Sequence, residues 1–232
     1  MVLPCSNPKV SKSAAPLEGV AVNRPLILLA CLVALILGWA AYSGQLSHPA
    51  NATALPLAKI EGSKIYFVPI GDFPRGRLDL LAQYYRQKYH LEITVLNSIP
   101  VDPATRNESR QQLMAEQLVA SLRNGVPDHA QRSEILIGFT SEDMYPTSQN
   151  WQFAFGWRQF SMGAAVVSTA RMSLHYDGEP LDPNLSDIRL RKTVTKDIGI
   201  LYYDMSPSQN PKSVLYNQIL GIQELDEVGE EF

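Results

Sequence analysis

Four aspartates are the side chains of this sequence best suited to acid and base chemistry, because two converging carboxylates can act as a general acid and a general base. They are Asp72, Asp143, Asp197 and Asp204. Acidic residues in loops and at helix starts are usually solvated, and nothing in the spacing of these four brings them together. The preferred interpretation is four solvated side chains.

Metal ligation and nucleophilic catalysis have equally few candidates. The histidines lack ligand spacing; they are His48, His90, His129 and His175. The serines lack a G-x-S-x-G nucleophile elbow; those considered are Ser168, Ser173 and Ser206. Both cysteines, Cys5 and Cys31, precede residue 32, so neither a disulfide nor a thiolate zinc site can stabilise the main domain.

The composition fits one packed domain and one membrane segment. The chain has 232 residues, of which 45% are hydrophobic and 19% charged, as in an ordinary globular protein. Its net charge of -3 gives no basic field that would attract a polyanion, so no nucleic-acid partner is expected.

Residues 26–42 contain no charged side chain and are apolar on every helical face, which predicts a transmembrane helix. Lys9, Lys12 and Arg24 precede this segment, and no Lys or Arg follows it until Lys59. This charge bias places the N-terminus in the cytoplasm and the rest of the chain on the far side. The lipid bilayer is therefore an expected partner, and the expected location is a single-pass membrane protein.

The predicted organisation is a cytoplasmic tail (residues 1–25), a signal-anchor helix (26–42), a linker (43–60) and one domain (61–232). Two alternatives stay open for the apolar segment. It could be a cleaved signal peptide, or residues 28–31 could form a lipoprotein cleavage box.

Strands and helices alternate along the predicted domain, which indicates an α/β fold with a mixed, mostly parallel sheet flanked by helices. Strands are expected at residues 64–70, 91–96, 134–139, 153–157 and 164–168. Helices are expected at residues 77–89, 108–124 and 187–203.

This order of segments resembles the archaemetzincins, a family of small zinc-dependent metallopeptidases in the metzincin group. The resemblance extends from about residue 65 to residue 232. Its carriers are the turn Pro69-Ile70-Gly71, residues 110–112, 138–145, 155–156 and 165–168, Arg171, and the helix 192–202. It implies a single metzincin-like domain.

The family signature H-E-x-x-H-x-x-G-x-x-H aligns with residues 196–206, where its three histidines are missing. Lys196 and Ile200 replace the first two, and Asp197 replaces the glutamate. A protonated lysine has no free lone pair and isoleucine has no donor atom, so neither ligates zinc. The positions that make up this altered motif, and that could still bind something, are Lys196, Asp197, Gly199, Ile200, Tyr203, Ser206 and Leu215.

The resemblance together with the altered motif predicts a membrane-anchored module that has lost zinc binding and peptidase activity. Such a domain would bind a peptide or protein, or only support the fold, and would need no cofactor and no catalytic residue. The alternative is an active zinc-dependent metallopeptidase, or another hydrolase, with unrecognised ligands. Lys196 could stand in for the zinc charge beside Asp197 or Asp204, but a solvated surface lysine is the simpler expectation.

Overall fold

The computed structural model describes residues 63–129, 131, 133–175 and 183–232, which all belong to one compact unit, Ala54–Phe232. The predicted cytoplasmic tail (1–25), membrane segment (26–42) and linker (43–60) all lie outside the described residues. Among the helices that are described, none is both long enough and apolar enough to cross a bilayer.

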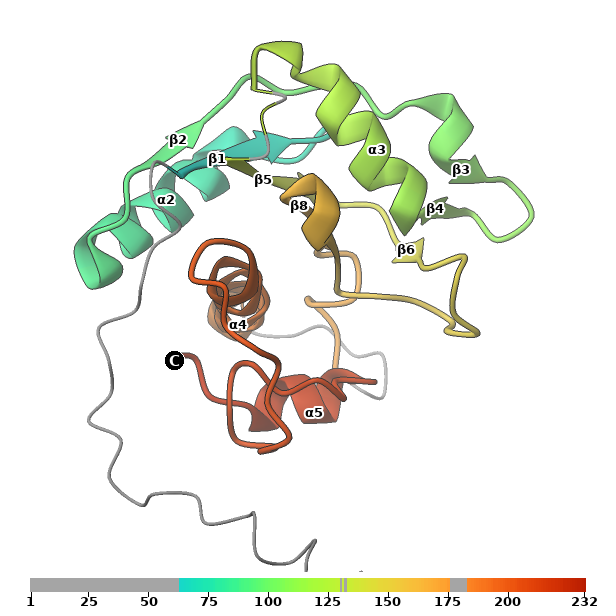
Figure 1. Ribbon diagram of the computed structural model, residues 1–232. Coiled ribbons are helices and arrows are strands. Elements are labelled where there is room, and N and C mark those ends of the chain that lie inside the picture. Colours follow the sequence, from blue (N-terminus) through green and yellow to red (C-terminus); the bar gives the residue numbers. More distant parts are fainter. Residues whose placement is uncertain (1–62, 130, 132, 176–182) are drawn as a thin grey trace, which may run out of the picture. The chain divides into compact units, whose positions relative to one another are not determined.

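A five-stranded sheet forms the centre of the unit (Figure 1). Its spatial order is β2 (Ile93–Val95), β1 (Lys64–Pro69), β5 (Glu134–Thr140), β8 (Ala164–Ser168) and β7 (Gly156–Gln159). The first four strands run parallel, and β7 pairs antiparallel with β8 at one edge. The predicted mixed, mostly parallel α/β sheet is therefore confirmed.

Helices cover both faces of this sheet, so its central strands are buried on both sides. Helices α2 (Arg75–Tyr89) and α4 (Pro183–Leu201) pack on one face, in a core that includes Phe67 and Ile137. Helix α3 (Ala115–Gly125) packs on the other, over Leu136. Figure 1 shows α3 on the opposite side of the strands from α4. Burial on both faces explains why these strands are continuously apolar instead of alternating.

The helix predicted at residues 108–124 begins late, at Ala115, and this part of the prediction is wrong. Gln111 takes a left-handed backbone conformation with φ of 53°. The residues after it leave the helical path and form strands. A small second sheet results, made of β3 (Arg106–Asn107), β4 (Gln112–Met114) and β6 (Met144–Tyr145). Pairing with a strand about thirty residues away decides the conformation of β4, and local sequence cannot show that.

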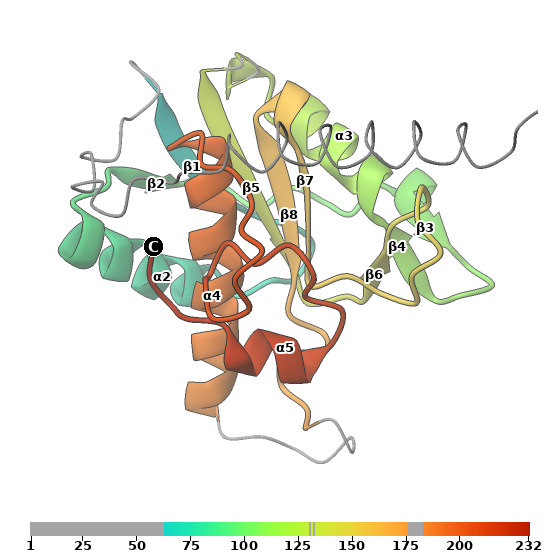
Figure 2. The same ribbon diagram turned by 60° about the horizontal axis from the view of Figure 1, so that its bottom comes forward.

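Short elements complete the unit: the 3-10 helices at Pro103–Thr105, Pro127–His129 and Phe160–Met162, and helix α5 (Ile222–Glu227). Figure 2 shows α5 lying across α4. Arg189, whose side chain is 1% exposed, donates from two nitrogens to the carboxylate of Asp226 at 2.7 Å each. Lys192 donates to the main-chain oxygens of Leu225 and Asp226. The buried cationic side chains of Arg189 and Lys192 therefore attach helix α5 to helix α4.

Candidate functional site

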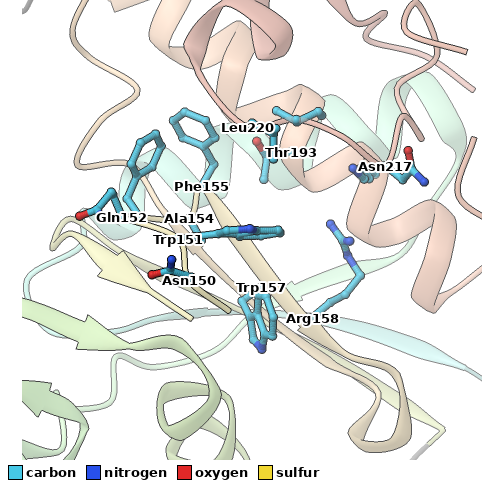
Figure 3. A pocket seen from close by; sticks show the side chains of 14 residues that line it. Asn150, Trp151, Gln152, Ala154, Phe155, Trp157, Arg158, Thr193, Asn217 and Leu220 are labelled. Atoms are coloured by element: carbon cyan, nitrogen blue, oxygen red, sulfur yellow. The ribbon is translucent and has the colours of Figure 1, made fainter. Parts of the chain in front are cut away.

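A pocket of about 550 Å³ lies between the edge strand β7 and helix α4. Residues 150–158 line it from the sheet side, Thr193 and Lys196 from α4, and Asn217, Ile219 and Leu220 from the segment that follows α4. Figure 3 shows the indole of Trp151 across the pocket, between Leu220 and Trp157. The rings of Trp151 and Trp157 meet edge to face, with centroids 6.1 Å apart. The pocket therefore has four aromatic and two cationic side chains in its wall.

Strand β7 has main-chain hydrogen-bonding groups along its open edge, the side that does not pair with β8. Ser168 N donates to Phe155 O at 2.9 Å, so the main chain of Phe155 faces β8. Main-chain groups alternate between the two sides of an antiparallel strand. The N–H and C=O groups of Gly156 and Arg158 consequently point to the open edge, and no hydrogen bond to them is found within the described part of the chain.

Gly156 sets how closely β7 approaches α4. A Cβ atom at this position would lie 2.9 Å from Thr193 Cγ2 and 3.6 Å from Asp197 Oδ2. The first of these distances is shorter than any carbon–carbon contact that packed side chains tolerate. A residue without a side chain is thus needed where the strand meets the helix, and this approach brings Arg158 of β7 to α4.

Asp197 is completely buried and forms an ion pair with Arg158. Arg158 Nε donates to Asp197 Oδ1 at 2.6 Å, while Asp197 Oδ2 has no hydrogen-bond partner among the described residues. Burial raises the pKa of Asp197, and the Arg158 guanidinium opposes that rise. The interpretation of Asp197 as a solvated carboxylate is wrong.

Lys196 is also buried, with 7% of its surface exposed, so the expected solvated lysine is wrong as well. Its ammonium donates to the main-chain oxygen of Tyr216. Burial lowers the pKa of Lys196 to about 8; the charge of Arg158 adds to this lowering and that of Asp197 opposes it. Because the carboxylate of Asp197 is paired with Arg158, the wall of the pocket carries more positive than negative charge.

The other positions of the altered motif lie elsewhere. Ile200 and Leu215 belong to one apolar cluster, together with Val214 and Met205. A Cβ atom on Gly199 would lie 2.6 Å from Phe232 Cε1 and 2.9 Å from Leu215 Cδ2. The structure thus brings Gly199, Ile200 and Leu215 together in apolar packing.

Tyr203 and Ser206 do not join the pocket either. The ring of Tyr203 meets that of Phe232 edge to face, with centroids 5.5 Å apart. Ser206 is exposed on the segment after α4. Of the seven motif positions, only Lys196 lines the pocket, and Asp197 lies behind it.

The remaining aspartates do not form a paired-carboxylate site. Asp72 and Asp204 are exposed, as expected for solvated residues. Asp143 accepts two hydrogen bonds from Arg171 Nε at 3.0 Å and one from Arg171 Nη2 at 2.6 Å. Asp143 and Asp197 are therefore each bound by an arginine of their own.

The described residues do not fit a zinc ion. Nowhere in residues 63–129, 131, 133–175 and 183–232 do three or more His, Cys, Asp or Glu side chains gather as a metal site would need. A zinc ion on this helix would need ligands at two positions one turn apart. These positions are Lys196, whose ammonium donates to a main-chain oxygen, and Ile200, whose side chain packs in an apolar cluster.

Comparison with known proteins shows that the chain is similar to archaemetzincins. No family model matches the chain. An archaemetzincin from Natronomonas pharaonis is 28% identical over 135 residues, which make up 57% of this chain and 74% of that protein. The crystal structure of an archaemetzincin from Archaeoglobus fulgidus, complexed with malonate, superimposes with a TM-score of 0.58 and 22% identity. That likeness covers 73% of this chain and 94% of the other. The chain is an archaemetzincin-like protein.

The expectation that no cofactor is involved is corrected by these relatives. A zinc-dependent peptidase from Methanocorpusculum labreanum shares the fold of this archaemetzincin-like chain, with a TM-score of 0.58 and 18% identity over 72% of this chain and 95% of that one. Zinc is therefore the cofactor to which the family points. The described residues alone, as shown above, do not supply a set of ligands for it.

Sequence reasoning missed several residues of the pocket. Arg158, Trp151 and Trp157 were not singled out, although they provide one of its two cations and two of its four aromatic side chains. One local signal was available: a glycine inside a strand, here Gly156 between aromatic residues, often marks a close approach of another element. The sequence does not show which element approaches.

Proposed function

We propose that this archaemetzincin-like domain binds an extended peptide segment along strand β7 and does not cleave it. The single observation that carries the proposal is the open edge of β7, with the main-chain groups of Gly156 and Arg158 directed toward it beside the aromatic pocket. A peptide that adds a strand to such an edge gains main-chain hydrogen bonds, while pockets select its side chains. This mode of binding needs no metal.

A second candidate function is peptide hydrolysis, because a structural neighbour is a zinc-dependent peptidase. It would need ligands that lie outside the described residues or come from elsewhere. The measurements below separate the two functions.

The test uses the full chain in mild detergent and a library of fluorescent peptides with extended, apolar-rich sequences. Binding is followed by fluorescence polarisation, and intact peptide mass is followed by mass spectrometry, with added zinc and separately with a chelator. We expect saturable binding and unchanged peptide mass under both conditions. Zinc-stimulated, chelator-sensitive cleavage would establish hydrolysis and refute the proposal.

Two controls tie the binding to the pocket. Trp151→Ala removes part of the aromatic lining and should weaken binding about tenfold, since one well-packed aromatic contact contributes roughly 1.5 kcal/mol. Leu80→Ala, at an exposed position of α2 outside this pocket, should leave binding unchanged. A peptide N-methylated at alternate residues should lose affinity, because it cannot donate to the strand edge.

We also propose that residues 26–42 anchor the domain in a membrane, with the N-terminus in the cytoplasm and the domain on the far side. The absence of charge in this segment and the basic residues before it support this orientation. Resistance of the expressed chain to alkaline carbonate extraction, together with protease access from the far side only, is the expected result. Release into the supernatant would contradict it.

A further inference from the structure

The charges around the pocket are unevenly distributed. Two cations, Arg158 and Lys196, line it, whereas the nearest carboxylate, Asp197, is completely buried behind them. The Arg158 side chain is 26% exposed and donates from Nε to Asp197; no hydrogen bond from its Nη atoms is found within the described residues. The Lys196 ammonium has a neutral main-chain oxygen as its hydrogen-bond partner. Donors therefore remain for an anionic group that enters the pocket.

The alternation of side chains along β7 determines where on a bound peptide this group would be. Arg158 points toward α4, as its ion pair with Asp197 shows, and Gly156 lies on the same face, next to Thr193. Trp157 points to the opposite face, where it packs beside the core under α3. Figure 3 shows Arg158 and Trp157 leaving β7 in different directions.

A strand added to this edge would alternate in the same way, with side chains directly opposite those of β7 on each face. The residue opposite Arg158 would project its side chain toward α4 and the Lys196 ammonium. The residue next to it in the peptide would project toward the rings of Trp157 and Trp151.

We propose that the occupant of the pocket is an acidic extended peptide, in which a glutamate or aspartate side chain meets Arg158 and Lys196 and the adjacent large apolar side chain packs on Trp157. Charge complementarity selects the first residue, and aromatic surface selects the second. The proposal rests on the peptide-binding function above and specifies the ligand of that same site.

The test measures the affinity of the full chain in mild detergent for three synthetic peptides that differ at one residue. The peptides are extended and carry Glu-Leu, Gln-Leu or Lys-Leu at their centre, with blocked ends so that no terminal carboxylate contributes. We expect the Glu-Leu peptide to bind about tenfold more tightly than the Gln-Leu peptide, as a charge-assisted hydrogen bond would provide. The Lys-Leu peptide should bind most weakly.

Substitution of the lysine adds an independent readout. Lys196→Met should abolish most of the preference for Glu-Leu over Gln-Leu. Lys192→Met is the matched control, because Lys192 is also a buried lysine of α4 that donates to main-chain oxygens but does not line the pocket. This variant should keep the preference. Circular dichroism of both variants establishes that they are folded.

The two proposals fail in different ways. If none of the three peptides binds to the wild-type chain, peptide binding itself is refuted. If all three bind with equal affinity, or if the preference survives in Lys196→Met, peptide binding stands and the acidic specificity is refuted.

Discussion

Removal of the Arg158 guanidinium should destabilise the domain strongly and in a pH-dependent manner. In Arg158→Met, the buried carboxylate of Asp197 would lose its ion pair and have no hydrogen-bond partner on either oxygen. Breaking one side of a buried pair costs roughly 3 to 5 kcal/mol. Because the Arg158 side chain is 26% exposed, water can partly replace it, and we expect about 3 kcal/mol at pH 7. For a domain of this size, that is a decrease in Tm of roughly 6 to 12 °C.

The pH dependence identifies the cause of this loss. Burial already raises the pKa of Asp197, and the variant lacks the guanidinium that opposes the rise. The folded variant therefore binds a proton at Asp197 more readily than the unfolded chain does. Its stability decreases as pH rises from the unfolded pKa of about 3.9 through the folded pKa, and the cost of the substitution becomes smaller in acid.

The assay is urea unfolding of the full chain in mild detergent, followed by circular dichroism between pH 5 and pH 8. Arg158→Met combined with Asp197→Asn should cost less than the sum of the two single changes, because the buried charge is then absent. Lys212→Met, which removes an exposed ion pair with Glu227, should change stability by less than about 0.5 kcal/mol. A loss for Arg158→Met below about 1 kcal/mol at every pH would refute the reasoning.

Three further predictions concern the helix and the contacts around it. The wild type should gain stability as pH rises from about 8 toward 10.4, because the folded pKa of Lys196 is about 8 and the unfolded chain binds the proton more tightly. Lys196→Met should lose this gain, and calorimetry of both proteins across this range checks the prediction. Gly156→Ala should cost about 1 to 3 kcal/mol in urea unfolding through its 2.9 Å clash, whereas Gly76→Ala, with open space around it in α2, should be neutral or stabilising. Gly199→Ala should lower Tm, because the new methyl group meets the aromatic ring of Phe232. Phe232→Ala in the same chain should restore part of the loss. Equal Tm values with and without the second change would contradict this.

Much of the fold could be predicted because its strands and helices carry local signals. Strand β8 has the predicted bounds, residues 164–168, and helix α2 begins two residues before its predicted start at Arg77. The prediction failed where distant pairing decides the backbone, as in β4. The edge strand was expected at residues 153–157 and lies at Gly156–Gln159, because pairing with β8 fixes its bounds.

The site was less predictable than the fold. Sequence could identify Lys196 and Asp197 as unusual, since the resemblance to the family places them where a histidine and a glutamate stand. Asp197 is paired with Arg158, which is 39 residues away from it in the sequence and lies on the strand that approaches α4 closely at Gly156. A charge state that depends on packing between distant segments has no local signature.

The way in which α4 holds the chain after it has a consequence for how this protein can diversify. Lys192 and Lys196 are bound to main-chain oxygens, those of Leu225, Asp226 and Tyr216. Every amino acid brings such an oxygen, so these attachments do not depend on the side chains at the receiving positions. Mutation can therefore change the side chains at these receiving positions while the lysines keep the segment after α4 attached to the helix.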